Sequence, residues 1–568
     1  MSKIKGSLAI IKCLQEEGVE LLFGYPGGAV IELYDELCKS SIRHILVRHE
    51  QGAVHAADGF ARATGKVGVA LLTSGPGATN GVTGIATAYC DSIPIVVLTG
   101  QVPRALIGND AFQEVDIVGI TRPCTKHNYL VNDPEDLVPV LREAFYLAAS
   151  GRPGPVLVDL PKDIIASMIA YPPKKKEPIK MQTYQPHTEP HPNQVEKACR
   201  ACLKAKRPVL YVGGGVILSN SNQELTQLAR RLNIPVTMTL MGLGGFPGTD
   251  PLSLGMLGMH GSYAANMSVA KSDLLIAVGS RFDDRVTGRL DAFAPQAKII
   301  HIDIDPTSIS KNVVVDIPIV ADCKLALQAI NSWLDKCDEY NPQEVAEHHQ
   351  PWVEQVQEWN AKHPLAYMED GEIIKPQFVI ETLHKLTGGN AIITTEVGQN
   401  QMWAAQFYKF NHPRRLLTSG GLGTMGYGLP AAIGAQMAFP EATVIDVAGD
   451  GSIQMNIQEL ATARECGAPV KIAILNNRYL GMVRQWQELF YNRHYASTVM
   501  EVTPDFVALA QAYGAVGLRA KTKAEVEPVI REALATKNVV IMDFSIHREE
   551  GVFPMVPAGK ATTEMLLV

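Results

Sequence analysis

One pattern recurs along the entire chain and restricts its fold more than any other feature. A short run rich in Val, Ile and Leu leads into a glycine-rich break, and a longer amphipathic segment follows. Each such unit predicts a β-strand followed by an α-helix. The units begin near Leu21, His44, Val67 and Ile93, then near Arg207, Ile234, Ser272 and Lys298, and finally near Asn390, Arg415, Thr443, Val470 and Val539.

Strands that are almost wholly apolar and alternate with helices indicate parallel sheets covered on both faces. The 568 residues are too many for one core, since a domain usually takes roughly 150. We therefore expect an α/β protein with three doubly wound parallel-sheet domains. Their expected bounds are 1–170, 190–335 and 372–550, with a Pro-rich linker at 171–189, a charged and partly helical one at 336–371, and a tail at 551–568.

Composition excludes several classes of protein. With 46% hydrophobic and 19% charged residues the chain is typical of globular proteins, and its net charge of −7 gives no reason to expect nucleic acid or an anionic membrane as a partner. No stretch approaches the ~18 apolar residues of a membrane span, and Gln15 interrupts the opening too early for a signal peptide. The 9 Cys are scattered, and the lone Cys199-x-x-Cys202 is expected to be structural, so we expect a reducing, cytoplasmic location.

Two neighbouring strands of the last third end in oxygen-bearing side chains. Asp450 follows the predicted strand 443–449, and Asn477 follows the predicted strand 470–475. One right-handed crossover returns both to the same edge of a parallel sheet, where ligands bind. A carboxylate and an amide oxygen beside a glycine-rich turn suit Mg²⁺ that also holds phosphate oxygens. An ordinary glycine turn with an Asn helix cap is the alternative, which the second polar strand end makes less favoured.

The Gly-Asp-Gly turn at Asp450, followed after 24 residues by Asn476-Asn477, resembles the diphosphate-binding signature of the thiamine-diphosphate enzymes. The resemblance implies that Asp450, Asn477 and a backbone carbonyl near Tyr479 hold Mg²⁺, which in turn holds the diphosphate of the cofactor.

Glu50 lies just past a predicted strand end, in a segment similar to the glutamate motif of that family. The resemblance implies that Glu50 hydrogen-bonds the thiamine pyrimidine ring bound to a second subunit and promotes proton removal from the thiazolium carbon. A desolvated, hydrogen-bonded carboxylate suits such proton sharing. Taken alone, Glu50 would be a solvated loop residue. A zinc-protease reading of His49-Glu50 fails, because Ala53 occupies the place of the second His.

The spacing Gly421-x-Gly423-x-x-Gly426 is formally a dinucleotide fingerprint, yet the next predicted strand offers no acidic residue for a ribose besides Asp450. The thiamine-enzyme resemblance instead implies that the Gly423 carbonyl binds the pyrimidine amino group and that Met425 supports the bent cofactor. Without the resemblance, Met425 would be a core residue.

Motifs in all three predicted domains narrow the family further. They include FGYPGGA, RHEQGAVHAADG, TSGPGATN, GRPGPVLVDLPKD, GMLGMHG, SRFDDRVTG, GGLGTMGYGLPAAIGA and LNNRYLGMVRQWQ. Together they resemble the catalytic subunits of the acetohydroxyacid synthase (acetolactate synthase) family over nearly the whole chain. The resemblance implies decarboxylation of pyruvate and transfer of the two-carbon fragment to pyruvate or 2-oxobutyrate. The products are acetolactate or acetohydroxybutyrate, in the first step of branched-chain amino acid biosynthesis.

The resemblance also implies three cofactors: thiamine diphosphate, Mg²⁺, and an FAD that undergoes no net redox reaction. Implied contacts to thiamine diphosphate are Gly27, Gly28, Glu50, Val397, Gly398, Gln399, Asn400, Gly423, Met425, Gly449, Asp450, Gly451, Ser452, Asn477 and Met482. Implied contacts to FAD are Arg152, Gly213, Gly214, Gly215, His260, Gly261, Arg281, Asp303 and Asp322. Glycine turns at strand ends fit a pyrophosphate, and a strand-end Asp fits a ribose hydroxyl.

Four further residues are expected to act on the substrates. Arg281 would bind the acceptor carboxylate, Trp486 would pack against its alkyl group, and Gln113 and Lys162 would line the substrate channel. A structural ion pair for Arg281 and a core position for Trp486 are the alternatives.

Two other functions remain open at this level. A pyruvate oxidase-like enzyme would use FAD for redox chemistry, but the RFDDR motif and Trp486 argue against it. A non-catalytic relative would be expected to have lost Glu50, Asp450 or Asn477, and all three are present. In the resembling family Glu50 and Asp450 meet across subunits, so a homodimer or tetramer is implied, together with a small regulatory subunit.

Overall fold

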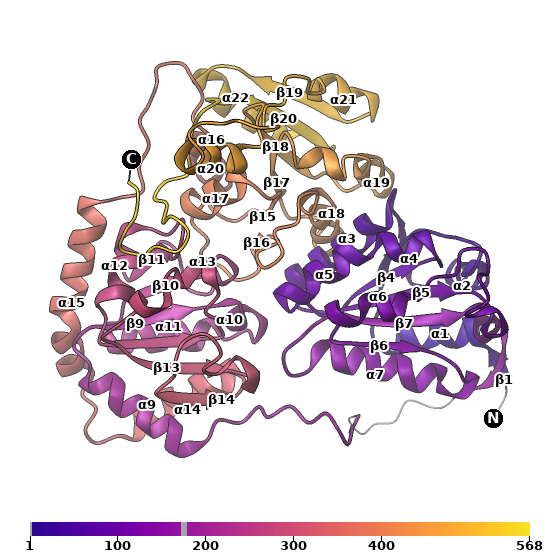
Figure 1. Ribbon diagram of the computed structural model, residues 1–568, viewed down its shortest axis with the longest axis horizontal. Coiled ribbons are helices and arrows are strands. Elements are labelled where there is room, and N and C mark those ends of the chain that lie inside the picture. Colours follow the sequence, from indigo (N-terminus) through magenta and orange to yellow (C-terminus); the bar gives the residue numbers. More distant parts are fainter. Residues whose placement is uncertain (1–2, 172–178, 568) are drawn as a thin grey trace.

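The computed structural model describes residues 3–171 and 179–567, so that 172–178 of the predicted first linker lie outside the described part. Its strands form three six-stranded sheets, one in each third of the chain, and all strand pairs within them are parallel. Helices cover both faces of each sheet (Figure 1). The predicted α/β fold with three parallel-sheet domains is therefore confirmed, while the proposed domain bounds stay a prediction.

The first sheet has the order β3-β2-β4-β5-β7-β6. Its strands are β2 (Leu21–Gly24), β3 (Arg43–Leu46), β4 (Gly68–Leu72), β5 (Ile95–Gln101), β6 (His127–Leu130) and β7 (Val156–Pro161). Its helices are α1 (Gly6–Glu16), α2 (Ile31–Leu37), α3 (Glu50–Thr64), α4 (Pro76–Asn80), α5 (Val82–Asp91), α6 (Ile117–Thr121), α7 (Leu137–Ala149) and α8 (Lys162–Ala166). A small antiparallel pair, β1 (Lys3–Lys5) and β8 (Met168–Ala170), joins the two ends of this unit.

The middle sheet has the order β11-β10-β9-β12-β13-β14. Its strands are β9 (Pro208–Val212), β10 (Val236–Met238), β11 (Ser253–Met256), β12 (Leu274–Val278), β13 (Lys298–Asp303) and β14 (Ile317–Val320). Its helices are α9 (Pro192–Lys204), α10 (Gly214–Leu218), α11 (Asn222–Leu232), α12 (Tyr263–Lys271), α13 (Asp284–Thr287) and α14 (Cys323–Lys336). Cys199 and Cys202 are buried in its apolar core.

Most of the charged segment 336–371 forms the long helix α15 (Pro342–Lys362), which packs on the middle unit. The Trp352 indole donates to the Pro208 carbonyl (3.1 Å), and His349 bonds to the carbonyl oxygens of Leu232 and Ala205. A pattern dominated by charge hides this buried stripe of Val, Trp and His.

The last sheet has the order β16-β15-β17-β18-β20-β19. Its strands are β15 (Ile392–Thr395), β16 (Leu416–Leu417), β17 (Val444–Gly449), β18 (Lys471–Asn476), β19 (Val516–Ala520) and β20 (Val540–Ser545). Its helices are α16 (Pro376–Thr387), α17 (Gln399–Phe407), α18 (Gly428–Ala438), α19 (Glu459–Cys466), α20 (Gly481–Phe490), α21 (Phe506–Ala512) and α22 (Lys523–Ala535). Short 3₁₀ turns elsewhere are Arg104–Leu106, Arg122–Cys124, Pro134–Asp136, Leu240–Gly242, Leu290–Ala292, Pro306–Ser308 and Ile453–Met455.

The three units meet around a common centre (Figure 1), and the contacts between them include those of α3 with α18 and of the C-terminal residues with the middle unit. Helices α3 and α18 cross closely, and a Cβ added to Gly434 would lie 2.0 Å from the Ala56 carbonyl oxygen, so only glycine fits there. The residues after 550 run from the last unit back to the middle one, where the Val556 amide donates to the Met259 carbonyl (2.8 Å). Within the described residues, no helix combines the length and the apolar character that crossing a membrane requires.

Asp159 on β7 gives the first unit a testable pH dependence. Burial raises the pKa of this carboxyl from 3.8 to about 7, although hydrogen bonds from Thr99 Oγ1 (2.7 Å) and Gln101 Nε2 (3.0 Å) oppose the rise and Asp116 adds to it. Because the folded-state pKa exceeds the unfolded one, the stabilising contribution is present below about pH 4 and is lost as the pH rises to about 7. As the pH rises from about 5 to about 8, the melting temperature of Asp159→Asn should therefore increase relative to that of wild type. Differential scanning fluorimetry measures this difference. Parallel pH profiles of the two proteins would contradict the burial argument.

Candidate active site

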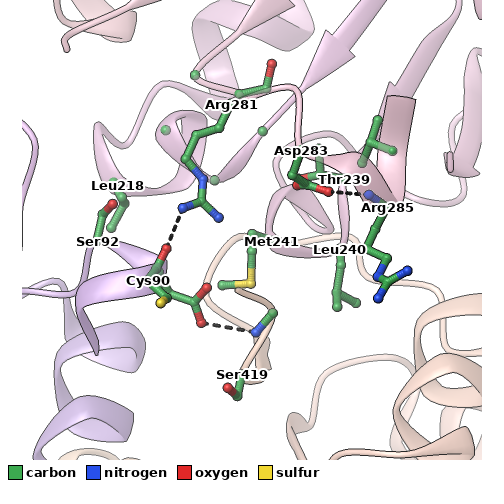
Figure 2. A pocket seen from close by; sticks show the side chains of 18 of the residues that line it. Cys90, Ser92, Leu218, Thr239, Leu240, Met241, Arg281, Asp283, Arg285 and Ser419 are labelled. Atoms are coloured by element: carbon green, nitrogen blue, oxygen red, sulfur yellow. Dashed lines mark hydrogen bonds between the residues drawn. The ribbon is translucent and has the colours of Figure 1, made fainter. Parts of the chain in front are cut away.

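A cavity of about 700 Å³ lies where the three units meet, and side chains from all three line it (Figure 2). The lining includes every predicted flavin contact except Gly261: Arg152, Gly213, Gly214, Gly215, His260, Arg281, Asp303 and Asp322. It also includes the predicted thiamine and acceptor residues Val397, Gly398, Gly423, Met425, Met482 and Trp486. The structure thus brings two predicted sets of residues to one cavity.

Two glycine turns form the floor of the cavity on the middle unit. The Gly213 amide donates to the Val278 carbonyl (2.9 Å), and a Cβ on Gly215 would lie only 2.6 Å from the Gly279 Cα. The Gly213 and Gly215 amides are engaged with Val278 and Gly279, so these glycines suit a pyrophosphate by letting it approach the backbone closely at the strand ends. Asp303 ends β13 nearby, and its carboxylate is nearly buried. The residues present therefore fit a dinucleotide.

Asp322 is a predicted flavin contact whose carboxylate is already engaged with the backbone. Its carboxylate accepts the amides of Lys324 (2.9 Å) and Leu325 (3.2 Å), so it caps the N-terminus of α14. It lines the cavity from that capping position.

Three arginines surround the cavity and take different places. Arg281 donates from Nη1 to the Cys90 carbonyl (2.7 Å), as Figure 2 shows, and Arg152 donates to Ser92 Oγ (2.9 Å). Arg285, on α13, instead places its guanidinium carbon 5.9 Å from the centre of the Trp486 ring, within cation–π range. Among the described residues, the cation–π partner of Trp486 is therefore Arg285. The RFDDR motif contains both arginines, and only the fold distinguishes them.

The predicted metal ligands meet at the carboxyl edge of the last sheet. Strands β17 and β18 pair, with Gly449 opposite Leu475, so Asp450 and Asn477 leave the sheet side by side. Asp450 is buried, and one of its carboxylate oxygens has no hydrogen-bond partner among the described residues. Burial raises the pKa of Asp450 to about 7, with the backbone amide of Asn477 opposing the rise. An unpartnered buried carboxylate oxygen beside an amide side chain fits Mg²⁺.

Neighbouring groups hold Asn477, the second predicted metal ligand, in place. Asn477 Oδ1 accepts the Tyr479 amide (3.0 Å), and its Nδ2 donates to Gln399 Oε1 (3.3 Å). Gln399 in turn donates to Gln485 (2.9 Å) on α20. The predicted thiamine-binding segments after β15 and β18 are therefore tied to each other by direct hydrogen bonds.

Another group of predicted residues lies at the carboxyl edge of the first sheet, outside the described lining of the cavity. Glu50 begins α3, is 8% exposed, and accepts a hydrogen bond from Asn80 Nδ2 (2.9 Å). A Cβ on Gly77 would lie 3.1 Å from Glu50 Oε1, and one on Gly75 would lie 2.8 Å from the Gln113 carbonyl oxygen. Glu50 and Gln113 therefore flank the same turn.

The remaining predicted residues of the first unit differ in how closely their surroundings pack on them. Gly27 approaches this edge so closely that a Cβ would lie 2.3 Å from Thr73 Oγ1. Gly28 has open space where its side chain would be, and Lys162 is exposed at the start of α8.

Comparisons with known proteins agree with the geometry. Residues 4–120, 195–330 and 396–544 match the N-terminal TPP binding domain, the central domain and the C-terminal TPP binding domain of thiamine pyrophosphate enzymes. The chain is 50% identical over its full length to the acetolactate synthase large subunit of Haemophilus influenzae, and 52% identical to the isozyme 3 large subunit of Escherichia coli, covering 99% of each. Acetolactate synthase 1, chloroplastic, of Nicotiana tabacum is 49% identical over 99% of this chain and 85% of its own.

These matches cover all three sheet units and confirm the resemblance inferred from the motifs. The chain belongs to the thiamine pyrophosphate enzymes and, within them, to the family of acetolactate synthase large subunits.

Proposed function

We propose that the protein decarboxylates pyruvate on thiamine diphosphate and transfers the two-carbon fragment to a second pyruvate or to 2-oxobutyrate. The observation that carries this proposal is that residues suited to thiamine diphosphate, to a dinucleotide and to an acceptor acid line one and the same cavity. Thiamine diphosphate, when bound, supplies the electron sink that decarboxylation needs. The protein binds the cofactor and the substrates, orients them, and excludes water from the site.

Asp450, Asn477 and a carbonyl near Tyr479 would hold Mg²⁺, which would neutralise the diphosphate at this edge. The unpartnered Asp450 oxygen supports this assignment. Gly423 has a positive φ of 73° that presents its backbone at the cavity, and Met425 lines the cavity beside it.

Glu50 is the proposed proton-sharing residue, although it stands outside the lining of this cavity within one chain. A second copy of the chain must then supply its Glu50, so we propose a homodimer or a tetramer of such dimers. Because the relatives are named large subunits, we also propose a small regulatory subunit as a partner.

The acceptor acid would contact both Trp486 and Arg285, which line the cavity side by side. The Arg285 guanidinium stands over the Trp486 ring, so one side chain can bind a carboxylate while the other packs an alkyl group. Binding of the acceptor carboxylate by Arg281 stays a prediction. The bond from Arg281 to the Cys90 carbonyl favours a role for this residue in binding the flavin. FAD would be held by Arg152, Arg281 and the glycine floor without net redox chemistry.

Reconstitution tests this function. Purified protein stripped of small molecules is supplied with thiamine diphosphate, Mg²⁺ and FAD, each omitted in turn, and given pyruvate with 2-oxobutyrate. We expect acetolactate and acetohydroxybutyrate only when all three are present. Pyruvate consumption without either product would contradict the proposal.

Trp486→Leu is expected to lower the preference for 2-oxobutyrate over pyruvate about tenfold, since one methylene in an apolar pocket is worth about 1–3 kcal/mol. The preference is measured as the product ratio in competition assays. Phe490→Leu is the matched control, because Phe490 packs on Trp486 edge to face but is outside the described cavity lining. An unchanged ratio in Trp486→Leu would remove this residue from the acceptor site.

A further inference from the structure

Three consecutive residues at the end of α5 form a junction: Cys90 bonds to the middle unit, Asp91 bonds to the last unit, and Ser92 bonds to Arg152 of the first unit itself. The Cys90 carbonyl accepts from Arg281, the Asp91 carboxylate accepts from Gly420 and Gly421, and Ser92 accepts from Arg152. All three residues line the cavity. This junction, Cys90 to Ser92, therefore lies between the dinucleotide side and the thiamine side.

Asp91 forms two of these connections through its carboxylate. Its Oδ1 accepts the Gly421 amide (2.7 Å) and its Oδ2 accepts the Gly420 amide (3.1 Å). A Cβ on Gly421 would lie 2.9 Å from both Asp91 Oδ1 and the Cys90 Cβ, so the two segments touch without room for a side chain. Hydrogen bonds to a charged acceptor are stronger than neutral ones.

Arg62 also holds the segment that contains Gly420 and Gly421. Its guanidinium is buried, pairs with Asp58, donates to Asp91 Oδ2 (2.9 Å), and donates to the Thr418 carbonyl (2.9 Å). Residues 418–421 are thus held from their carbonyl side by Arg62 and from their amide side by Asp91. Removing Asp91 leaves Arg62 paired with Asp58, so no isolated charge is buried.

Residues 418–421 directly precede two of the predicted thiamine contacts in the chain. Gly423 and Met425 follow Gly421 by only two and four residues and line the cavity. A shift at Gly421 would displace both, and misplacement of about 1 Å is costly at such sites.

We propose that Asp91 is a positioning residue that fixes the Gly420–Met425 segment for thiamine diphosphate and links it, through Cys90 and Ser92, to the arginines of the dinucleotide side. This inference rests on the proposed function and extends it. It gives an FAD without redox chemistry a physical role, since a ligand that orders Arg152 and Arg281 also orders the junction they bond to. Such coupling is reciprocal between the two ligands.

The test measures the Kd of thiamine diphosphate with Mg²⁺ by calorimetry, with FAD absent and saturating. In wild type we expect FAD to tighten this Kd at least about fivefold. In Asp91→Ala we expect the Kd with FAD to rise about tenfold and the effect of FAD to fall below about twofold. Asp91→Asn keeps one acceptor oxygen but turns its NH2 group toward a donor, so it should recover only part of the affinity.

Two comparisons separate positioning from general stabilisation. Asp273 also accepts two successive backbone amides, those of Lys206 and Arg207 (both 2.8 Å), and is not among the described residues lining the cavity. Asp273→Ala should lower the melting temperature but leave both Kd values unchanged. Gly421→Ala disturbs the same contact from the other side and should reproduce the affinity loss, which keeps the test valid if Asp91→Ala folds poorly.

The outcomes are distinguishable. If wild type binds thiamine diphosphate and the Kd values are unchanged in Asp91→Ala or Gly421→Ala, the proposed role of Asp91 is wrong while the proposed function stands. A wild-type chain that binds no thiamine diphosphate would overturn the proposed function and this inference together.

Discussion

Glu50→Gln is expected to lower kcat by about 10²- to 10⁴-fold, the usual contribution of a positioned acid–base group, while leaving the Kd of thiamine diphosphate within a few-fold. The amide cannot share a proton with the pyrimidine nitrogen, but it has the shape of the carboxylate. It can still hydrogen-bond Asn80, which now donates to Glu50 Oε2 at 2.9 Å. Steady-state assays and calorimetry give the two quantities.

Gln51→Ala is the matched control for this variant. Gln51 is the next residue on α3, and its side chain contacts His55 (3.2 Å), so its loss should change kcat little. Turnover within about threefold of wild type in Glu50→Gln would remove Glu50 from the proton-sharing role.

Asp450→Ala is expected to raise the Kd of Mg²⁺ by about 100-fold or more, since even groups that only orient a metal ligand contribute about 10- to 100-fold. The variant removes the only carboxylate predicted to bind the ion, including its unpartnered oxygen. Thiamine diphosphate should bind weakly as well, because its diphosphate loses the bridging cation. Titration of Mg²⁺ by calorimetry or by recovery of activity measures the change.

Asp446→Asn controls for burial on the same strand. Burial and the neighbouring Glu396 raise the pKa of Asp446 well above its usual range, and Asn has the shape of this buried carboxyl group. The Mg²⁺ Kd should stay near that of wild type in this control. Equal Mg²⁺ affinity in Asp450→Ala and wild type would rule out the proposed metal site.

Mixing the Glu50→Gln and Asp450→Ala chains tests the assembly of the site across subunits. In a mixed dimer one site receives both wild-type residues and the other receives neither. Random re-association of equal amounts should restore about a quarter of wild-type activity. Failure to regain any activity, with mixed dimers shown to form, would place Glu50 and Asp450 in the same chain's site.

The sequence predicts local features of this fold well because they depend on short-range patterns. Apolar strands alternating with helices are sufficient to indicate three parallel sheets. The pairing of Asp450 with Asn477 follows from one right-handed crossover, which has a fixed hand. Both statements need no knowledge of contacts between distant parts of the chain.

Features that depend on how the units pack could not be predicted in this way. Arg281 and Arg285 are equivalent in a motif, and only the approach of α20 to α13 shows which one meets Trp486. Asp91 carries no recognisable motif, since its partners Gly420 and Gly421 lie more than 300 residues away. The packing of α15 on the middle unit could not be predicted either, because its buried Trp352 bonds to Pro208, which lies far away in the sequence.

The most direct measurement mixes the complete enzyme with pyruvate under nitrogen and follows product formation and flavin absorbance together. The account predicts that acetolactate accumulates while the absorbance of the oxidised flavin stays constant, because FAD holds the site without exchanging electrons. Bleaching of the flavin in step with pyruvate consumption, with no acetolactate formed, would contradict it.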